Sequence, residues 1–315
     1  MSSVSALPIE LWPQILRSIY EVSLSSDILL SDYPWVDTLR TKRRHDSASI
    51  RRRAIIRSIS QVCRSWKMFA NQLRYQDIEL GFSLSFHTLL MERQSHSGIF
   101  NETRRLSVTR IWSYNVHDLS LLVQSMPRLE WLQLSTHRIE ESYPRTWLPS
   151  LLGPQSCLLY LDLKPLHNKG PIFIDSDTIS LLSGLAIRLR RLTCAIKYVA
   201  ESDGQVCRAP RFEDLQVLRL MDIRCDQGHE PVGCEWFSRW HLPSLKQFYI
   251  PRNWEYCTKL LDGGVGAQLE VLDASVGVFL FPTPWHVRRD DMNHRHTPLF
   301  PILSNCGFSA PGCIR

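Results

Sequence analysis

The sequence predicts an α/β protein with a small N-terminal helical domain, followed by a solenoid. Parallel strands would line the concave side of the solenoid, with helices or irregular turns outside. Two observations carry this prediction. Apolar residues recur at helical spacing within residues 1–80, and seven strand-like hexamers recur between residues 103 and 274 at intervals of 24 to 31 residues. A strand-and-helix unit of this period cannot bury its apolar face alone, so we expect stacked copies to form a parallel sheet.

Composition sets the class of protein. The 315 residues are 44% hydrophobic and 22% charged, as in ordinary globular proteins. No uncharged apolar run approaches the roughly 18 residues that span a bilayer, so we expect no membrane partner. The first residues carry no basic side chain and include Glu10 where a signal peptide would be apolar. Nine scattered cysteines, an odd number, favour reduced thiols. We therefore expect an intracellular protein, cytoplasmic, nuclear or both.

The N-terminal helical prediction rests on two apolar faces. The first consists of Leu7, Leu11, Ile15, Leu16 and Ile19. The second consists of Ala54, Ile55, Ile59, Val62, Trp66, Phe69 and Leu73. A short apolar alternation at Ile78, Leu80 and Phe82 then predicts a strand. Residues 1–80 are therefore expected to form one helical domain, interrupted by an insertion at about 23–53.

The insertion holds most of the excess positive charge. Segment 40–57 has eight basic residues and one acidic residue, whereas the rest of the chain has 29 basic and 30 acidic residues. Three explanations stay open: a solvated loop that leads into a basic helix, a nuclear import signal, and a nucleic-acid-binding segment. Nucleic acid is the least favoured partner, because no aromatic side chain is interleaved to stack on bases.

The hexamers predict the strands and their two faces. They are TRRLSV at 103, LEWLQL at 129, LLYLDL at 158, LRRLTC at 189, LQVLRL at 215, LKQFYI at 245 and LEVLDA at 269. The fourth and sixth places are apolar and should point into the core, so the third and fifth places should point away from it. Between hexamers, segments 116–126 and 178–188 are amphipathic, with Asp177 as the expected N-cap of the second, and segments 234–240 and 255–261 are shorter helical candidates. The solenoid should span 81–285, followed by an irregular tail at 286–315.

The N-terminal segment resembles an F-box. The matching residues are Leu7, Pro8, Ile9, Glu10 and Leu11, then Ile15 and Leu16, then Val62, Cys63, Arg64, Ser65, Trp66 and Lys67. The resemblance implies that this domain docks on a Skp-family adaptor and, through it, on a cullin. The side chains that it assigns to adaptor binding are Leu7, Pro8, Ile9, Ile15, Leu16, Val62, Cys63 and Trp66. The apolar pattern alone would assign these helix faces to the domain's own core. The sequence does not show which of these residues lie in the core and which at an interface.

The hexamers resemble irregular leucine-rich repeats, which commonly follow an F-box. They lack the usual asparagine at the ninth place, where only Asn253 matches, so we expect a less regular and flatter arc. Together the two resemblances imply a substrate-recognition subunit of an SCF-type ubiquitin ligase. It would bind an unidentified target protein and catalyse nothing itself. The alternatives are a non-ligase interaction scaffold and a nuclear protein that binds nucleic acid through segment 40–57.

The target is expected on the third- and fifth-place face, which should be exposed. The candidate residues are Trp131, Gln133, Tyr160, Asp162, Arg191, Arg219 and Tyr249. Trp, Tyr and Arg are the side chains enriched at binding hot spots, and the core does not require them at these places.

No motif indicates catalysis or a cofactor. The sequence contains no phosphate-binding loop, no GxSxG elbow and no HExxH helix. Cys225, His229 and Cys234 lie close together, but spacings of four and five residues are poor for a structural zinc site. We therefore expect neither a metal nor a cofactor.

Overall fold

The computed structural model covers residues 1–315. It describes residues 54–80, 86–95, 98–109, 116–136, 147–153, 157–165, 172–199, 208–225, 235–250, 260–261, 265–274 and 277–280, together with Leu11, Gln14, Ile15 and Ser18. The chain divides into two compact units, Met1–Ile78 and Glu79–Arg315, here called the helical unit and the sheet unit. The expected insertion at 23–53 and the expected tail at 286–315 lie outside the described residues.

The helical unit contains two consecutive helices where the sequence suggested one continuous apolar face. Residues 54–60 are helical, and the N–H groups of Gln61 and Val62 then donate to the carbonyls of Ser58 and Ile59 at 3.2 Å. Helix α3 (Arg64–Arg74) begins after Cys63. The turn between the helices interrupts the helical spacing of the apolar residues. Apolar residues before and after the turn therefore do not lie on one helix face.

A small apolar core holds these helices together. Ile59, Phe69, Ala70 and Leu73 are buried, and Ile55, Ile56 and Trp66 pack against them. Val62, which the sequence placed on the same apolar face, is instead 59% exposed. That expectation was wrong because Val62 lies in the turn, where it faces away from this core.

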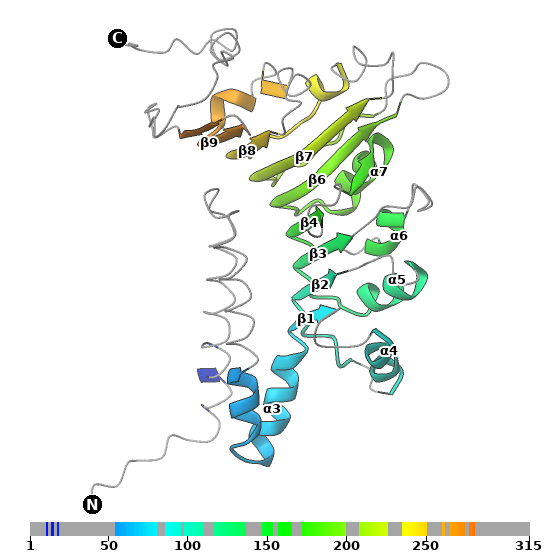
Figure 1. Ribbon diagram of the computed structural model, residues 1–315, viewed down its shortest axis with the longest axis vertical. Coiled ribbons are helices and arrows are strands. Elements are labelled where there is room, and N and C mark those ends of the chain that lie inside the picture. The colour runs from blue at the N-terminus through cyan, green and yellow to red at the C-terminus, as the bar shows by residue number, and fades with distance from the viewer. Residues whose placement is uncertain are drawn as a thin grey trace, which may run out of the picture. The chain divides into compact units, whose positions relative to one another are not determined.

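One open sheet organises the other unit (Figure 1). In spatial order, its strands are β1 (Asp77–Leu80), β2 (Arg105–Thr109), β3 (Trp131–Thr136), β4 (Tyr160–Pro165), β6 (Arg191–Tyr198), β7 (Val217–Cys225), β8 (Gln247–Ile250), β9 (Val271–Ala274) and β10 (Gly277–Leu280). Strand β5 (Phe173–Asp175) pairs with β6 beside this path. Successive strands from β2 to β9 are parallel, and β10 is antiparallel to β9. The predicted α/β class with a mostly parallel sheet is therefore confirmed.

The hexamer alignment also predicts the register of the sheet. Third-place residues pair across successive strands in the order Arg105, Trp131, Tyr160, Arg191, Val217, Gln247 and Val271. One hydrogen-bond pattern repeats at each of these interfaces. The carbonyl of a second-place residue, from Arg104 to Lys246, accepts the N–H groups of the second- and third-place residues of the next hexamer at 2.7–3.1 Å.

Within the described part of the chain, a row of helices connects the strands on one side of the sheet (Figure 1). They are α4 (Phe86–Ser95), α5 (Val116–Gln124), α6 (Trp147–Leu152) and α7 (Ser176–Leu185). Each contacts the next in the row. Helix α5 confirms the prediction at 116–126, and residues 235–238 form the short helix predicted near 234–240. Of the candidate at 255–261, only 260–261 are described, and they are helical. No described helix has the length and apolar character that a membrane crossing requires.

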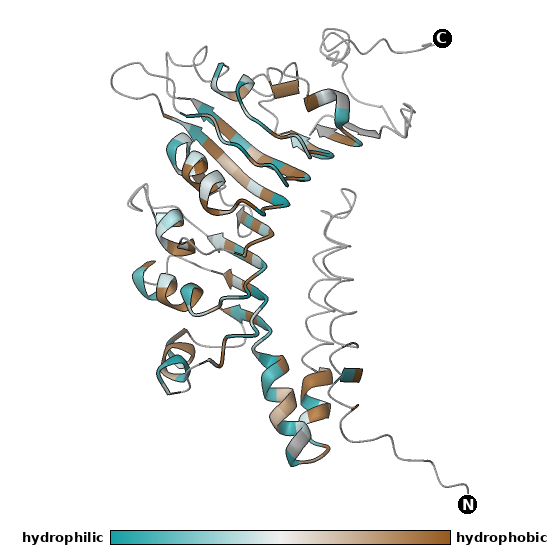
Figure 2. Cartoon of the chain, turned by 180° about the vertical axis from the view of Figure 1, so that it is seen from behind, coloured by the Kyte–Doolittle hydropathy of each residue, from teal (hydrophilic) through white to brown (hydrophobic). Residues whose placement is uncertain are grey.

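The predicted core positions are confirmed. Every fourth- and sixth-place side chain whose burial is described is at most 7% exposed. Figure 2 shows the corresponding alternation of hydrophobic and hydrophilic residues along the strands. This side of the sheet therefore forms the apolar core that the hexamers encode.

Strands β6 and β7 are longer than the hexamers. The ninth-place residues Lys197 and Ile223 lie inside them, although a repeat of the usual kind turns at this place. The register also shifts by one residue, since Cys194 pairs with Leu220 but Ile196 pairs with Ile223. Backbone groups at the ninth place are thus satisfied by strand pairing, which removes the need for a turn asparagine.

Candidate functional site

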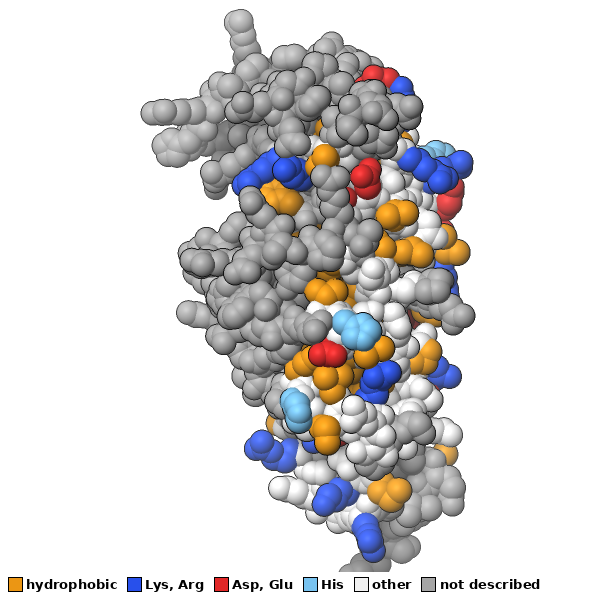
Figure 3. Space-filling view, turned by 90° about the vertical axis from the view of Figure 1, so that its right-hand side faces the viewer, with side chains coloured by type: hydrophobic (Ala, Val, Ile, Leu, Met, Phe, Trp, Pro, Cys, Tyr) orange, Lys and Arg blue, Asp and Glu red, His pale blue; other side chains and the backbone are white. Residues whose placement is uncertain are grey.

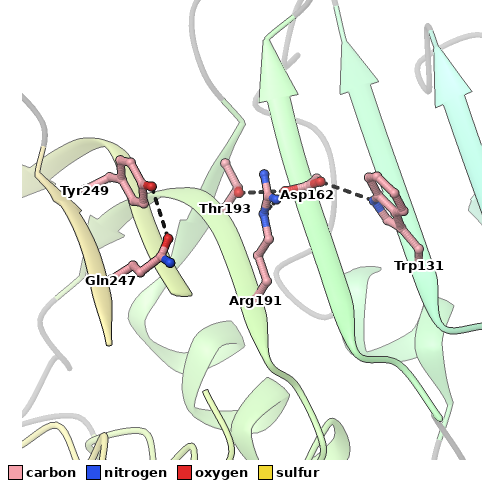
Figure 4. A network of polar contacts seen from close by, with 6 residues as sticks. All are labelled: Trp131, Asp162, Arg191, Thr193, Gln247 and Tyr249. Carbon is pink, nitrogen blue, oxygen red and sulfur yellow. Dashed lines mark hydrogen bonds and ion pairs between the residues drawn. The ribbon is translucent and has the colours of Figure 1, made fainter. Parts of the chain in front are cut away.

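The third- and fifth-place side chains of β2–β9 form what we call the polar face of the sheet. At its centre Asp162, on β4, is 0% exposed. The Thr193 hydroxyl donates to Asp162 Oδ1 at 2.6 Å, and the Trp131 indole Nε1–H donates to Oδ2 at 3.2 Å (Figure 4). Both carboxylate oxygens therefore have a neutral donor, supplied by the strands on either side of β4.

A buried ion pair completes this cluster. Arg191 Nε lies 3.4 Å from Asp162 Oδ1, and Arg191 is only 4% exposed. Taking two charges out of water is costly, and mutual attraction offsets the cost only when further hydrogen bonds satisfy the groups. The donors from Thr193 and Trp131 meet that condition for the carboxylate. We therefore regard Trp131, Asp162, Arg191 and Thr193 as one interdependent polar cluster.

Aromatic and cationic side chains extend the cluster toward β2. The Arg105 guanidinium lies 4.3 Å from the centroid of the Trp131 ring. The rings of Trp131 and Tyr160 lie 6.0 Å apart, at an interplanar angle of 51°. These contacts follow from the register, since the three residues are neighbours in the third-place row. Each ring is thus covered in part by the side chain of an adjacent strand.

The predicted exposure of this face was wrong for the central strands. Trp131 is 4% exposed, and Asp162 and Arg191 are buried with it. Alternation along a strand identifies two faces but does not say that one of them is open, and parallel sheets are commonly buried on both faces. The hexamer pattern therefore identified the residues of this face correctly. The expected exposure was wrong for Trp131, Asp162 and Arg191.

The face is more accessible toward β7–β9. Arg219, Gln247 and Tyr249 are half-buried, as are Gln133 and Tyr160. The Tyr249 hydroxyl donates to Gln247 Oε1 at 3.2 Å (Figure 4). The Arg219 guanidinium lies 5.7 Å from the centroid of the Tyr249 ring. These contacts hold the three side chains in one arrangement while part of each still reaches solvent.

The candidate adaptor-binding residues lie in different environments. Leu7, Pro8, Ile9 and Leu16 lie outside the described residues. Ile15 is half-buried, and Trp66 packs against the core of the helical unit. Val62 and Cys63 are both exposed, directly before α3. Among the candidate residues of the second motif, Trp66 therefore belongs to the core, whereas Val62 and Cys63 lie on the surface.

The structure describes the side chains of three free cysteines. Cys63 and Cys157 are exposed, whereas Cys194 is buried in β6. Burial raises the pKa of the Cys194 thiol well above its ordinary value, so the thiol stays protonated. Among the described residues, no three His, Cys, Asp or Glu side chains are grouped so as to hold a metal ion. Of the three residues considered above for zinc binding, His229 and Cys234 lie outside the described residues.

The structure adds contacts made by residues outside the candidate target-binding set, although the hexamer pattern already places Arg105 and Thr193 on this face. Thr193 and Arg105 join the polar cluster, and the Arg224 guanidinium lies 4.3 Å from the Phe173 ring on β5. The hexamer register places Thr193 beside Asp162 and Arg105 beside Trp131, so the first two contacts follow from it. Strand β5 has no hexamer, so no sequence signal indicated the third contact.

Comparison with known proteins supplies no relative: no family model matches this chain, and neither does any curated protein or solved structure.

Proposed function

We propose that this chain is a substrate-recognition subunit of a cullin-based, SCF-type ubiquitin ligase. The helical unit would be an F-box that binds a Skp-family adaptor, and the sheet unit would be a leucine-rich-repeat solenoid that binds the protein to be ubiquitinated. The chain would catalyse nothing itself. Its contribution would be proximity, because holding a target lysine near the charged conjugating enzyme raises the effective concentration of the reactants.

One observation carries the adaptor half of the proposal. Within the VCRxW part of the motif, Trp66 packs into the core of the helical unit, while Val62 is 59% exposed and Cys63 is exposed beside it. A branched apolar side chain that its own core does not use is available to a partner. Burying one such side chain at an interface contributes about 1.5–3 kcal/mol.

Two features support the repeat half. All seven hexamers pair in one register, and the doubled hydrogen bond at the second place recurs at each strand interface from β2 to β9. A structure built from equivalent stacked units has this translational regularity. The helices on one side of the sheet are consistent with the same architecture (Figure 1).

The target-binding residues are reassigned within the polar face. Trp131, Asp162 and Arg191 are buried, so we propose that they support the sheet rather than contact the target. Arg219 and Tyr249, with Gln247, offer part of their surface and include side-chain types enriched at binding hot spots. Gln133 and Tyr160 are half-buried and remain at the margin of this surface.

Adaptor binding is tested with Val62→Asp in the full chain. The variant should lose at least about tenfold in affinity for a purified Skp-family adaptor, because a carboxylate would enter an apolar contact. Ile187→Asp is the matched control, since Ile187 is also an exposed aliphatic side chain but lies in the sheet unit. Equal adaptor binding by the wild type and Val62→Asp would refute this docking assignment. No binding by the wild type would leave the non-ligase scaffold as the better proposal.

Target capture is tested by affinity purification and mass spectrometry of the tagged chain. Arg219→Ala with Tyr249→Ala should deplete the target while leaving the adaptor bound. Arg239→Ala is the control, because Arg239 is an exposed arginine whose ion pair is local, with Glu235 four residues earlier. Retention of the same target by the double variant would exclude this end of the polar face as the binding surface.

A further inference from the structure

Beyond the hexamers, strands β6 and β7 continue side by side and bring two cations together (Figure 1). Lys197 pairs with Arg224 in the register of the two strands, and both side chains are exposed. Residues that pair across a sheet share one face, so these side chains are neighbours. Like charges at directly opposite positions are unfavourable. A bound anion would relieve this repulsion.

A β-bulge gives Arg224 this position. Two residues of β7, Met221 and Asp222, lie opposite the single residue Ala195 of β6. Without the extra residue, strict alternation along β7 would point Ile223 away from the core and Arg224 into it. With the bulge, Ile223 is 1% exposed and Arg224 is on the surface. Bulges are common beside functional sites, where they re-aim a side chain.

Neighbouring side chains hold the Arg224 guanidinium in one orientation. Its Nε–H donates to Asp222 Oδ2 at 3.3 Å, and its Cζ lies 4.3 Å from the centroid of the Phe173 ring. Ala195 lies between Phe173 and Arg224 in the sheet and is small enough to let them meet. Among the described residues, no group hydrogen-bonds to the two Nη groups of Arg224. A guanidinium held in this way presents a planar pair of donors, which matches an oxyanion.

The carboxylates near this position are already engaged. Asp222 accepts from Arg224 and, through Oδ1, from the next backbone N–H at 2.9 Å. Asp175 pairs with Lys197 from the side of β5, but its carboxylate accepts the Thr178 N–H at 2.6 Å and faces the positive end of the α7 dipole. The two cations and Asp222 then sum to a net charge of +1. That charge matches a carboxylate better than a dianionic phosphate.

The surroundings do not form a broad basic surface. Figure 3 shows Lys and Arg side chains scattered among hydrophobic and other side chains on the face that it draws. Elsewhere in the sheet unit, Arg128, Arg239 and Lys246 are each paired with a glutamate. Anion binding therefore depends on local geometry at Arg224 rather than on long-range steering. Nucleic acid, whose affinity comes from many phosphate contacts, is a poor fit.

The neighbourhood of the two cations suits an extended peptide. Phe173, against the guanidinium, is half-buried, so part of its ring can meet an apolar group. Arg219, on the target-binding surface proposed above, lies on the same side of β7, about 15 Å from Arg224 at the rise of a strand. An extended segment of about five residues spans that distance.

We infer that Arg224 and Lys197 bind a carboxylate of an extended peptide segment, with an apolar residue of the segment against Phe173. The Nη groups of Arg224 donate two hydrogen bonds to the carboxylate, and Lys197 faces it from β6. The inference rests on the proposed function in one respect, because the segment is taken to belong to the target protein. None of the three residues lies within a hexamer, so the repeat itself does not account for this site.

The test begins with two random peptide libraries, one amidated at the C-terminus and one with a free C-terminus. Both are selected on the immobilised full chain. Peptides that carry a carboxylate next to an aromatic or aliphatic residue should be enriched. Enrichment from both libraries assigns the site to an Asp or Glu side chain. Enrichment from the free library alone assigns it to a C-terminal carboxylate.

Binding of a selected peptide to variants of the full chain then tests the residues. Arg224→Gln should weaken binding about tenfold, and Arg224→Lys should weaken it too, because an ammonium group lacks the planar pair of donors. Lys197→Gln should weaken it several-fold. Arg190→Gln is the matched control, because Arg190 is an exposed cation within a hexamer. In a double-mutant cycle, amidation of the peptide's carboxylate should cost little more once Arg224 is Gln.

Additive effects in this cycle, or selected peptides without a carboxylate, would overturn the inference. Tighter binding when phosphoserine replaces the acidic residue would also overturn it, because the site would then be one for phosphate. Melting curves identify any variant that fails to fold, and Lys197→Glu then carries the test, with a larger loss expected than for Lys197→Gln.

Adaptor binding is measured separately on the same preparations. A chain that binds the adaptor but whose selected peptides ignore Arg224 refutes this inference alone. A chain that binds the peptides through Arg224 but binds no adaptor refutes the ligase proposal and leaves the carboxylate site standing.

Discussion

The carboxylate of Asp162 shows how a polar residue is accommodated inside this sheet. It accepts hydrogen bonds from Thr193 and Trp131 and forms an ion pair with Arg191, each from a neighbouring strand. Removing one partner of such a pair leaves the other charge buried without its counterion, which costs about 3–5 kcal/mol. The cluster is therefore sensitive to single substitutions, although its net contribution to stability is small or even unfavourable relative to an apolar core.

Burial of Trp131 changes what its substitution should do. Trp131→Ala should destabilise the fold by about 3–5 kcal/mol, comparable to Leu132→Ala at about 2–5 kcal/mol, because both leave cavities. The adjacent residues point to opposite faces, and both are buried. Urea unfolding of the two variants checks this. If Trp131→Ala had the stability of the wild type, the polar face would be open at β3, contrary to the structure.

The buried thiol of Cys194 predicts selective labelling. Its pKa is raised because burial disfavours the thiolate, which is the reactive form. Native-state alkylation at pH 8 should modify Cys63 and Cys157 but spare Cys194 until the chain unfolds. Peptide mass spectrometry with and without urea measures this. Labelling of Cys194 as fast as Cys157 would contradict its burial.

The same shift makes stability depend on pH in the alkaline range. The unfolded thiol ionises near the ordinary value of 9.0, whereas the folded thiol keeps its proton. Above about pH 9 the unfolded state therefore binds fewer protons, and the free energy of unfolding contributed by this group falls as pH rises. Below that pH its contribution is constant.

At the scale of single elements, the start of α7 shows how neighbouring structure selects a cap. The sequence suggested Asp177, but the Asp175 carboxylate accepts the Thr178 N–H at 2.6 Å, and Asp177 lies in the first turn. Strand β5 ends at Asp175, which keeps that residue in the extended conformation of an N-cap. The pairing of β5 with β6 thus shifts the helix start by two residues.

Substitution of the two aspartates tests this assignment. Asp175→Ala should destabilise the protein by about 0.5–2 kcal/mol, because the capping bond is lost. Asp177→Ala should cost about 0.3–1 kcal/mol, since only its interaction with the helix dipole is lost. Thermal melting ranks the two variants. The reverse ranking would restore the cap that the sequence suggested.

The end of α6 depends on a glycine. Gly153 follows the helix with φ +67°, and its N–H donates to the Pro149 carbonyl at 3.1 Å. A Cβ there would meet only ordinary contacts with Gln124, so Gly153→Ala should cost about 1–2 kcal/mol through backbone strain alone. Gly184, inside α7 with open space around it, is the control. Gly184→Ala should stabilise by about 0.5–1 kcal/mol. Equal effects of both substitutions on melting would exclude strain at Gly153.

For the whole molecule, we expect two separable binding functions. Val62→Asp should weaken adaptor binding at least about tenfold and keep the target, whereas Arg219→Ala with Tyr249→Ala should lose the target and keep the adaptor. The reason is that these residues belong to different compact units. Quantitative mass spectrometry of both purifications measures the two losses independently. Loss of both partners in either variant, with folding intact, would show that one surface serves both.

The sequence by itself determined the order of the seven hexamer strands, their register at the hexamers and the identity of one core face. A hexamer repeated at near-constant intervals has only one way to align its apolar places, so Leu132, Leu161 and Leu192 had to share a face. It also indicated helix α5, because that segment is amphipathic at helical period.

Only the tertiary structure decided which polar residues are buried and which apolar ones are exposed. Trp131 and Arg219 occupy equivalent faces in the repeat, yet one is buried and the other half-accessible. Val62 and Phe69 look alike in the apolar pattern, yet a turn separates them and leaves Val62 on the surface. Burial depends on what other segments bring to a face, and alternation within one segment carries no information about its neighbours.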